Sequence, residues 1–220
     1  MTATEILAAH VASSVERAAK LLLSGQLVAF PTDTVYGVGA PAFDAASVAA
    51  IYVAKERPPE KAIPVLIADE ADLVRVTNAV PEGARALISH FWPGGLTLVL
   101  PKRPDVPEIV SSDATVAVRI PDLELTRALL RLTGPLATTS ANCSGQPSPI
   151  TSDDVIAQLG DRIAAVLDGG ACPGGIPSTV VDCVASPPRV LREGAVLFST
   201  LSSIMPEIRR INSNQPDRSE

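Results

Sequence analysis

Four short segments of the chain place polar, charged or glycine residues directly after apolar runs. They are residues 31–37 (PTDTVYG), 55–58 (KERP), 140–145 (SANCSG) and 174–179 (GGIPST). In open α/β sheets, ligands bind where loops leave the ends of strands. The sequence therefore predicts one binding site, built from loops that lie far apart along the chain.

Lys55 and Arg57 are candidates for anion binding, because they stand two residues apart just before a proline. In extended geometry both side chains reach the same polyanion, to which arginine offers a planar fork and lysine a point charge. The alternative is a solvent-exposed pair of cations that Glu56 and Glu60 neutralise. The residues alone leave both interpretations open.

Ser140 and Asn142 can direct hydroxyl, amide and backbone donors at an oxyanion or a nucleotide. Both residue types are also common in turns, so plain loop structure is the alternative. Arg119 follows a run, 115–118, that has the pattern of a buried strand. A buried and unpaired arginine is costly, so Arg119 needs either a carboxylate partner or a ligand.

Several common motifs do not occur in the sequence. There is no GxxxxGK[ST] loop, no GxSxG elbow and no GxGxxG fingerprint, which argues against a P-loop, an α/β-hydrolase and a Rossmann dinucleotide site. Cys143, Cys172 and Cys183 lack CxxC spacing, so reduced thiols are expected rather than disulfides or structural zinc. His10 and His90 lie outside the polar segments, so catalysis by histidine is not expected.

Helices and apolar strands alternate along most of the chain, and this order is typical of a layered α/β sheet. Strands are predicted at residues 27–30, 63–68, 96–100, 115–120, 136–139, 163–167, 178–183 and 189–191. Helices are predicted at 13–23 (with a capping box at Ser13–Glu16), at 44–55 after an Asp44 cap, from 69, from 81, at 122–132, from Ser152 or Asp153 to 159, and at 200–210.

The bulk composition favours one soluble globular domain. Of the 220 residues 46% are hydrophobic, which is enough to form a sizeable core. The net charge of −6 argues against a broad basic face for nucleic acid, although a local basic groove stays open. No signal peptide and no apolar stretch near the roughly 20 residues of a membrane span is visible, so a cytoplasmic protein is expected.

Seven segments that include these polar loops form an ordered set over roughly residues 14–200. They are PTDTVYGVGAPAFD (31–44), KERP (55–58), FWPGGLTLVL (91–100), TVAVRIP (115–121), SANCSGQPSP (140–149), GGIPSTVVD (174–182) and VLREG (190–194). Together they resemble the motifs of the YrdC-type threonylcarbamoyl-AMP synthase family. One motif would be weak evidence, whereas seven in register are highly specific.

The resemblance implies an α/β fold with a YrdC-like twisted mixed β-sheet, helices on both faces and a positively lined concave cleft in a single domain. The catalytic domain is expected over residues 14–205 and a partly disordered C-terminal tail over 206–220. The chain is similar to the short type of the family.

The resemblance also implies a reaction. L-threonine, bicarbonate (or carbon dioxide) and ATP, with Mg²⁺, would condense to threonylcarbamoyl-AMP and pyrophosphate. The product would serve the threonylcarbamoyl-adenosine modification of tRNA. The expected partners are therefore a downstream tRNA threonylcarbamoyl transferase complex and, weakly, tRNA itself.

The family's functional residues carry over to three groups of positions. The catalytic group is Lys55, Arg57, Ser140 and Asn142. The residues around L-threonine are Thr32, Thr34, Tyr36, Arg119, Thr138 and Ser178. The residues around ATP are the catalytic group together with Ser111, Ser148 and Arg192. No metal ligand is assigned.

Four positions depart from the family pattern. Leu66 and Leu123 stand where histidine is common, Pro177 where glutamate is common and Glu193 where proline is common. Two other functions are alternatives: an RNA-binding maturation factor without catalysis, and an adenylating domain that uses a carbamoyl donor, as in hydrogenase maturation proteins. The latter carry additional zinc-finger-like and acylphosphatase-like domains, which are not expected here.

Overall fold

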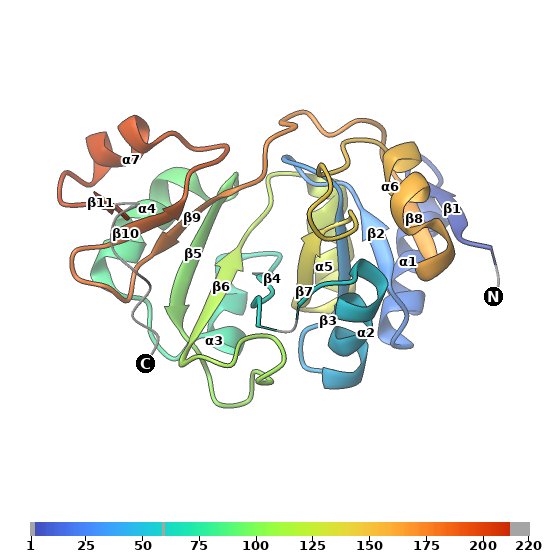
Figure 1. The fold of residues 1–220 in the computed structure, drawn as a ribbon, viewed down its shortest axis with the longest axis horizontal. Helices are drawn as coiled ribbons and strands as arrows, with labels where there is room; N and C mark the ends of the chain where they lie inside the picture. The colour runs from blue at the N-terminus through green and yellow to red at the C-terminus, as the bar shows by residue number, and fades with distance from the viewer. Residues whose placement is uncertain (1–2, 59, 212–220) are drawn as a thin grey trace.

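The computed structural model describes residues 3–58 and 60–211 (Figure 1). A single mixed sheet runs through this part of the chain. Its strands in sheet order are β1 (Glu5–Ala8), β8 (Ala165–Asp168), β2 (Val28–Phe30), β3 (Gly37–Pro41), β7 (Leu136–Ser140), β4 (Val65–Leu66), β6 (Thr115–Arg119), β5 (Leu96–Pro101), β9 (Thr179–Asp182), β10 (Arg189–Arg192) and β11 (Arg209–Arg210).

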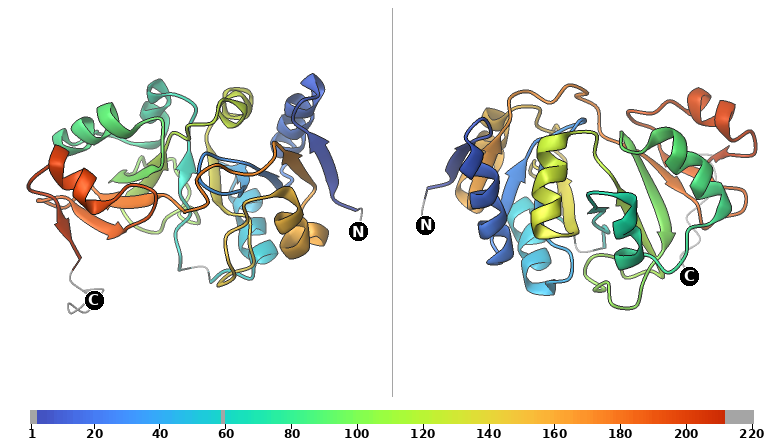
Figure 2. Two further views of the ribbon diagram at one scale, coloured as in Figure 1. Left: turned by 90° about the horizontal axis from the view of Figure 1, so that it is seen from above. Right: turned by 180° about the vertical axis from the view of Figure 1, so that it is seen from behind.

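Helices cover the two faces of the sheet unequally (Figure 2). One face carries α1 (Ala12–Leu23), α3 (Leu73–Val76), α4 (Glu82–Phe91) and α5 (Glu124–Thr133), whereas α2 (Ala45–Lys55) and α6 (Ser152–Leu159) lie on the other. In Figure 1, α2 and α6 stand in front of one half of the sheet, while β5 and β6 have no helix in front of them. Helix α7 (Phe198–Ile204) lies beside α4. These observations confirm the predicted mixed α/β fold with helices on both faces.

The register of the central strands brings separate polar segments together. Antiparallel pairing of β3 with β7 places Gly37 opposite Ser140. Strand β4 joins β7 to β6, and Leu66 pairs with both Leu136 and Arg119. The loop between β2 and β3 and the end of β7 therefore lie at the same edge of the sheet. Arg119, at the end of β6, lies level with the start of β7 and reaches that loop through its side chain, which contacts Thr34.

Helix α2 forms as predicted. Asp44 caps it, because its Oδ1 accepts hydrogen bonds from the backbone nitrogens of Ala46 (3.1 Å) and Ser47 (3.3 Å). Val48 and Ile51 are fully buried in the larger core cluster, which fixes the face that α2 turns toward the sheet. No helix within the described residues is long and apolar enough to cross a membrane.

Two predicted helix starts are wrong. Helix α1 begins after Val11, which makes no side-chain cap, so the predicted capping box at Ser13 does not form. The reason is a tight turn after β1, in which the Val11 nitrogen donates to the Ala8 oxygen and leads the chain into the helix early. Helix α6 is capped by Thr151, not by Ser152 or Asp153, and Thr151 and Asp154 form a capping box.

Strands β1, β3 and β11 were not predicted. The sequence of β3, GVGAP, is that of a turn, but the small residues are required by packing, because a Cβ on Gly39 would lie 2.9 Å from the Phe30 ring. The last helix is α7 at 198–204 instead of 200–210. Strands β1 and β11 continue the sheet on either side of the predicted 14–205 domain, and residues 212–220 of the predicted tail lie outside the described residues.

Candidate active site

Lys55 ends helix α2 with its side chain directed into the protein, and the residue is only 1% exposed. Its Nζ donates to the backbone oxygen of Ser140, to that of Asn142 (2.5 Å) and to Asn142 Oδ1 (3.4 Å). Three acceptors match the three donors of an ammonium group. Burial, helped by the charge of Arg57, lowers the pKa of Lys55 from 10.5 to about 8. Lys55 is therefore no solvent-exposed cation, and it holds the loop after β7 in place.

The loop after β7 is also fixed by its own side chains. The Asn142 amide nitrogen donates to the backbone oxygens of Cys143 (2.9 Å) and Gln146 (2.7 Å). The Ser144 nitrogen donates to the Lys55 oxygen (2.8 Å), so the loop and the end of α2 bind each other in both directions. Within the described residues the Ser140 hydroxyl makes no such bond and stays available to a ligand.

Arg57 is half-buried and follows Glu56, the residue at which the chain turns after α2. Its Nε donates to the Lys61 oxygen (3.1 Å) and its Nη2 to the Ala62 oxygen (2.8 Å). The Tyr52 hydroxyl donates to the same Lys61 oxygen (3.1 Å) and to the Ile109 oxygen (2.9 Å). These bonds bring the buried segment that contains Ser111 close to Arg57.

Arg119, at the end of β6, is 6% exposed and has a carboxylate partner. Its Nη2 pairs with Asp33 Oδ1 at 2.5 Å, its Nη1 donates to Thr34 Oγ1 at 2.8 Å, and its Nε donates to the Gly94 oxygen at 2.9 Å. Asp33 Oδ1 also accepts from the Asp122 nitrogen (3.0 Å). A guanidinium has five donors, so two of them remain for a ligand.

A group of hydroxyls surrounds this ion pair. Thr32 Oγ1 lies 2.8 Å from Thr34 Oγ1, and Thr97 Oγ1 lies 2.8 Å from Ser178 Oγ. The two pairs belong to one region, because the Gly175 nitrogen donates to the Thr34 oxygen (2.8 Å). Together they offer hydrogen-bonding groups for a small polar ligand.

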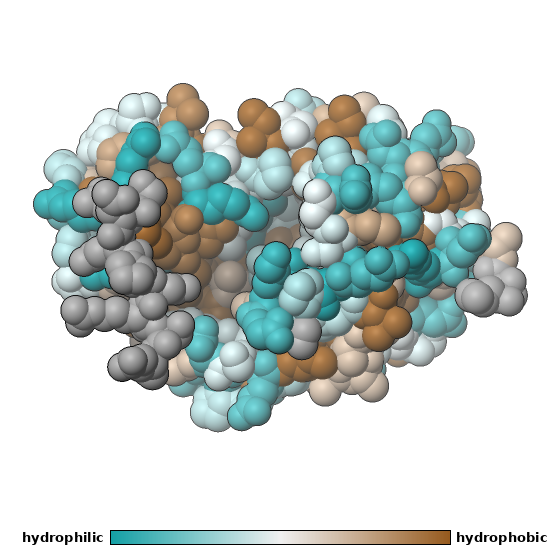
Figure 3. All heavy atoms as spheres, viewed as in Figure 1, coloured by the Kyte–Doolittle hydropathy of each residue, from teal (hydrophilic) through white to brown (hydrophobic). Residues whose placement is uncertain are grey.

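Arg192 connects the two parts of the site. Its Nη2 donates to the Ser178 backbone oxygen (2.9 Å). Burial is the main cause that lowers the pKa of Arg57 and of Arg119, and the charge of Arg192 lowers both pKa values further. The four cations therefore form a series of neighbouring charges, in which Arg57 acts on Lys55 and Arg192 acts on Arg57 and Arg119. Figure 3 shows that this face of the protein is hollowed between its two halves.

Three further predicted residues lie inside the fold. Tyr36 is fully buried, and its hydroxyl donates to the Gly170 oxygen (2.8 Å). Burial raises the pKa of this phenol, so Tyr36 supports the site from within. Thr138 is 6% exposed and pairs with Gly39 across β7 and β3. Ser148 is half-buried next to Pro149, whose oxygen accepts from the Tyr36 nitrogen (2.9 Å).

Two residues with clear contacts were missed by the sequence analysis, Asp33 and Thr97. Asp33 stands inside the PTDT segment, so its position was a signal, whereas Thr97 lies in an apolar strand and gave none. Among the described residues there is no group of three His, Cys, Asp or Glu side chains that could hold a metal. The donors gathered here are cationic, which does not fit a protein-held Mg²⁺ but fits Mg²⁺ that arrives bound to phosphates.

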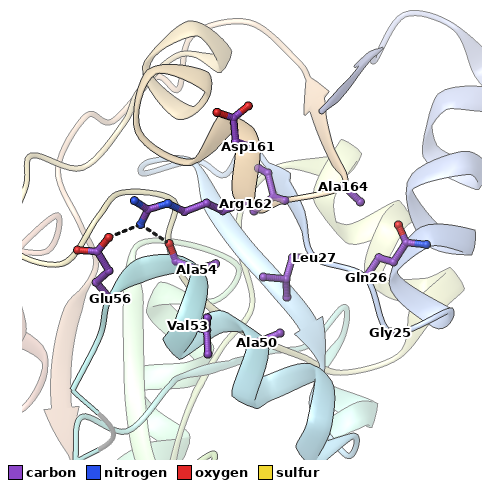
Figure 4. A pocket seen from close by; sticks show the side chains of 11 residues that line it. Gly25, Gln26, Leu27, Ala50, Val53, Ala54, Glu56, Asp161, Arg162 and Ala164 are labelled. Carbon is purple, nitrogen blue, oxygen red and sulfur yellow. Dashed lines mark hydrogen bonds and ion pairs between the residues drawn. The ribbon is translucent and has the colours of Figure 1, made fainter. Parts of the chain in front are cut away.

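An open groove of about 720 Å³ lies on the far side of α2 (Figure 4). It is lined mainly by apolar residues of α2, of the start of β2 and of the segment before β8, and none of the predicted site residues lines it. The charged residues that line it are Glu56, Asp161 and Arg162. It is therefore a different feature from the site that contains Lys55 and Arg119.

A family profile and several known relatives match this chain. The profile of the Sua5/YciO/YrdC family, described as "Telomere recombination", matches residues 20–194. The chain belongs to the Sua5/YciO/YrdC family. A relative from Bacillus subtilis, named threonylcarbamoyl-AMP synthase, is 41% identical over 94% of this chain and 60% of its own length. A Mycobacterium tuberculosis relative, named putative threonylcarbamoyl-AMP synthase, is 40% identical over 83% of this chain and 84% of its own.

A solved family member supports the same assignment at the level of structure. Sua5 from P. abyssi, described as complexed with L-threonine, superposes with a TM-score of 0.91 and 38% identity, over 95% of this chain and 62% of that protein. This chain thus spans about three-fifths of the length of the B. subtilis and P. abyssi family members.

Proposed function

We propose that the chain is a threonylcarbamoyl-AMP synthase, a nucleotidyltransferase that condenses L-threonine, bicarbonate or carbon dioxide, and ATP. The observation that carries this proposal is the site in which cations adjoin a buried ion pair and hydroxyls. Arg57 and Arg192 suit a polyphosphate, while the Arg119–Asp33 pair and the hydroxyls suit a small zwitterion. The names of the relatives agree with this pairing of ligands.

The amino acid half of the site is built around Arg119. Two of its N–H groups remain after its bonds to Asp33, Thr34 and Gly94, and a substrate carboxylate would take them. A charge-assisted hydrogen bond of this kind contributes roughly 1.5–3 kcal/mol. The paired hydroxyls of Thr97 and Ser178 would recognise a hydroxyl group on the substrate, which a site of this kind discriminates strongly.

The nucleotide half requires charge neutralisation and positioning. The amine of threonine and carbon dioxide form a carbamate and release a proton. A carbamate oxygen then attacks the α-phosphorus of ATP, and the bond to the bridging oxygen breaks as pyrophosphate leaves. Attack by one anion on another is opposed by charge, so Arg57 and Arg192 stabilise the transition state. Mg²⁺ enters with ATP as part of the substrate and screens its phosphates.

Lys55 serves this reaction by holding the loop that presents Ser140. Its ammonium group donates to three oxygens of the loop. Lys55 therefore fixes the shape of the loop and leaves the direct phosphate contacts to the arginines. No side-chain nucleophile is required. Placing three reactants together supplies on the order of 7–11 kcal/mol of the barrier reduction.

The proposal extends to the cell. The product is a labile mixed anhydride, which suits a tRNA threonylcarbamoyl transferase as the next enzyme, in the cytoplasm. A non-catalytic RNA-binding maturation factor is the rival, and the net charge of −6 disfavours it.

The decisive experiment measures pyrophosphate release from ATP, bicarbonate and Mg²⁺ with and without L-threonine. Release that depends on threonine is expected. Serine and valine serve as controls, since each lacks one of threonine's two side-chain groups. Equal release without threonine would reject the substrate, and RNA binding without any turnover would favour the rival.

A further inference from the structure

Arg162 lies outside every segment that the sequence analysis singled out, yet its guanidinium reaches the corner between Lys55 and Arg57 (Figure 4). It belongs to the 3-10 turn η2 (Gly160–Arg162), directly after α6. Its Nη1 pairs with Glu56 Oε1 (2.7 Å), donates to the Ala54 oxygen (3.1 Å) and lies 3.8 Å from Cys143 Sγ. One nitrogen thus contacts both the end of α2 and the loop after β7.

The corner that Arg162 contacts has an unfavourable backbone conformation. Among the residues that the structure describes, Glu56 is the one non-glycine residue with a positive φ (φ 53°, ψ 42°). Glycine usually takes this left-handed position at the end of a helix, because a Cβ is disfavoured there. The left-handed turn directs Lys55 into the protein and leaves Arg57 on the other side.

The same corner is hydrogen-bonded to the loop after β7. The Ser144 nitrogen donates to the Lys55 oxygen (2.8 Å), and the Cys143 nitrogen donates to Gln158 Oε1 (3.1 Å) on α6. The Ala54 oxygen is one of the last carbonyls of α2, which have no partner within the helix. Arg162 supplies that partner and simultaneously holds the Glu56 carboxylate.

We propose that Arg162 is a positioning residue that acts through Glu56. It stabilises the left-handed corner, and the corner sets the separation of Lys55 from Arg57 and the shape of the loop after β7. The side chains of Arg162 and Glu56 are 40% and 69% exposed, so this ion pair contributes little to global stability. Its effect is therefore confined to the nucleotide half of the site. The expected effect on the KM for ATP rests on the proposed function, whereas the expected effect on the loop after β7 does not.

The test compares three variants. Arg162→Met keeps a long side chain and removes every hydrogen-bond donor. Arg162→Lys keeps one nitrogen with three donors. This should be sufficient, because a single nitrogen of Arg162, Nη1, makes all the contacts described above. Arg17→Met is the matched control, because it removes an ion pair of similar exposure with Glu5 (3.1 Å; 51% and 43% exposed) away from the site. All variants are first checked for an unchanged midpoint of chemical unfolding.

Two readouts are expected to move together. In Arg162→Met the backbone amides of Ser144 and Cys143 exchange hydrogen about 3- to 10-fold faster, the range of one lost hydrogen bond. The KM for ATP rises by a similar factor while the KM for L-threonine stays constant, because the Arg119 half is untouched. Arg162→Lys restores most of both values, and Arg17→Met changes neither.

A second pair of substitutions tests the route through Glu56. Glu56→Ala removes the carboxylate, and adding Arg162→Met to it should produce a smaller further loss than in the parent chain, because only the bond to the Ala54 oxygen is left to lose. Unchanged amide exchange in Arg162→Met, additive losses in the double variant, or equal rises of both KM values would each overturn the proposal. Should the parent chain release no threonine-dependent pyrophosphate while Arg162→Met still loosens Ser144, the proposed function fails and the positioning role stands.

Discussion

Replacing Lys55 by methionine separates the charge of the buried ammonium group from the volume of its side chain. Methionine is similar in length and fills the same space, but it donates no hydrogen bond. We expect Lys55→Met to fold and to lose threonine-dependent pyrophosphate release, because the Ser140 and Asn142 oxygens lose their shared donor. Lys20→Met is the matched control. Lys20 stands in the last turn of α1, as Lys55 stands in the last turn of α2, but Lys20 is exposed.

The expected change in stability is the difference of two opposing effects. Burial lowers the pKa of Lys55 from 10.5 to about 8, so carrying its charge in the folded protein costs about 3 kcal/mol at pH 7. The substitution removes that cost. It also leaves two buried backbone oxygens without a donor, at about 1–3 kcal/mol each. The free energy of unfolding at pH 7 should therefore stay within about 3 kcal/mol of the parent value.

The pH dependence of the unfolding free energy tests the burial of Lys55 more sharply than its value at pH 7 does. Its folded pKa lies below its unfolded pKa, so between pH 8 and 10.5 the unfolded chain binds more protons and stability rises with pH. Below pH 8 this contribution is constant. From pH 7 to pH 9.5 the difference in unfolding free energy between the parent and Lys55→Met should shift by about 2 kcal/mol in favour of the parent.

Guanidinium chloride unfolding at both pH values measures this shift, and Lys20→Met should follow the parent at each. If Lys55→Met follows the parent too, the lysine is not buried as a charged group. If the variant keeps full turnover, the ammonium group is not needed to shape the loop that presents Ser140.

Three further outcomes are expected. Arg57→Ala should reduce threonine-dependent pyrophosphate release on the order of 100-fold with an unchanged unfolding midpoint, and normal turnover would contradict a phosphate role. Asp33→Ala leaves Arg119 buried without its carboxylate and should lower the free energy of unfolding by about 3–5 kcal/mol; Asp33→Asn keeps an acceptor and should lose less, so equal losses would argue against the ion pair. Thr97→Val removes the hydroxyl bonded to Ser178 and should raise the KM for L-threonine about 5- to 10-fold in steady-state assays, whereas a rise in the KM for ATP alone would place these hydroxyls in the wrong half.

Elements with strong local signals were predictable from the sequence. Helix α2 has an aspartate cap and an apolar face of suitable spacing, and its predicted bounds were confirmed. Strand β3 was not predictable from its own residues. Its glycines are required because the side chains of Phe30 and Thr138, on the two neighbouring strands, leave no space for a Cβ. The cap of α6 was misplaced by one residue because Thr151, Ser152 and Asp153 are all capable of capping.

The candidate site was predictable as a set of segments but not as a set of contacts. The motifs placed Arg119 in the site, yet whether a carboxylate or a ligand would neutralise it stayed open until Asp33 was seen at 2.5 Å. The exposed interpretation of Lys55 was equally reasonable from KERP alone. The burial of Lys55 depends on the Ser140–Asn142 loop, which lies about 85 residues away along the chain and supplies the oxygens that accept hydrogen bonds from its ammonium group.

Burial also decides between the two functions that the cations could serve. Lys55 and Arg119 are 1% and 6% exposed; the Lys55 donors are all bound to oxygens of the loop after β7, and Arg119 keeps two N–H groups for a ligand. The phosphodiester backbone of an RNA presents its charges along an extended surface and needs accessible cations to meet it. Cations this deeply buried do not meet an extended phosphodiester backbone, whereas the half-buried Arg57 is accessible to a compact anion. Since the charge of Arg192 lowers the pKa of Arg57, a polyphosphate bound beside both would relieve that repulsion. The arrangement therefore favours a nucleotide over a nucleic acid.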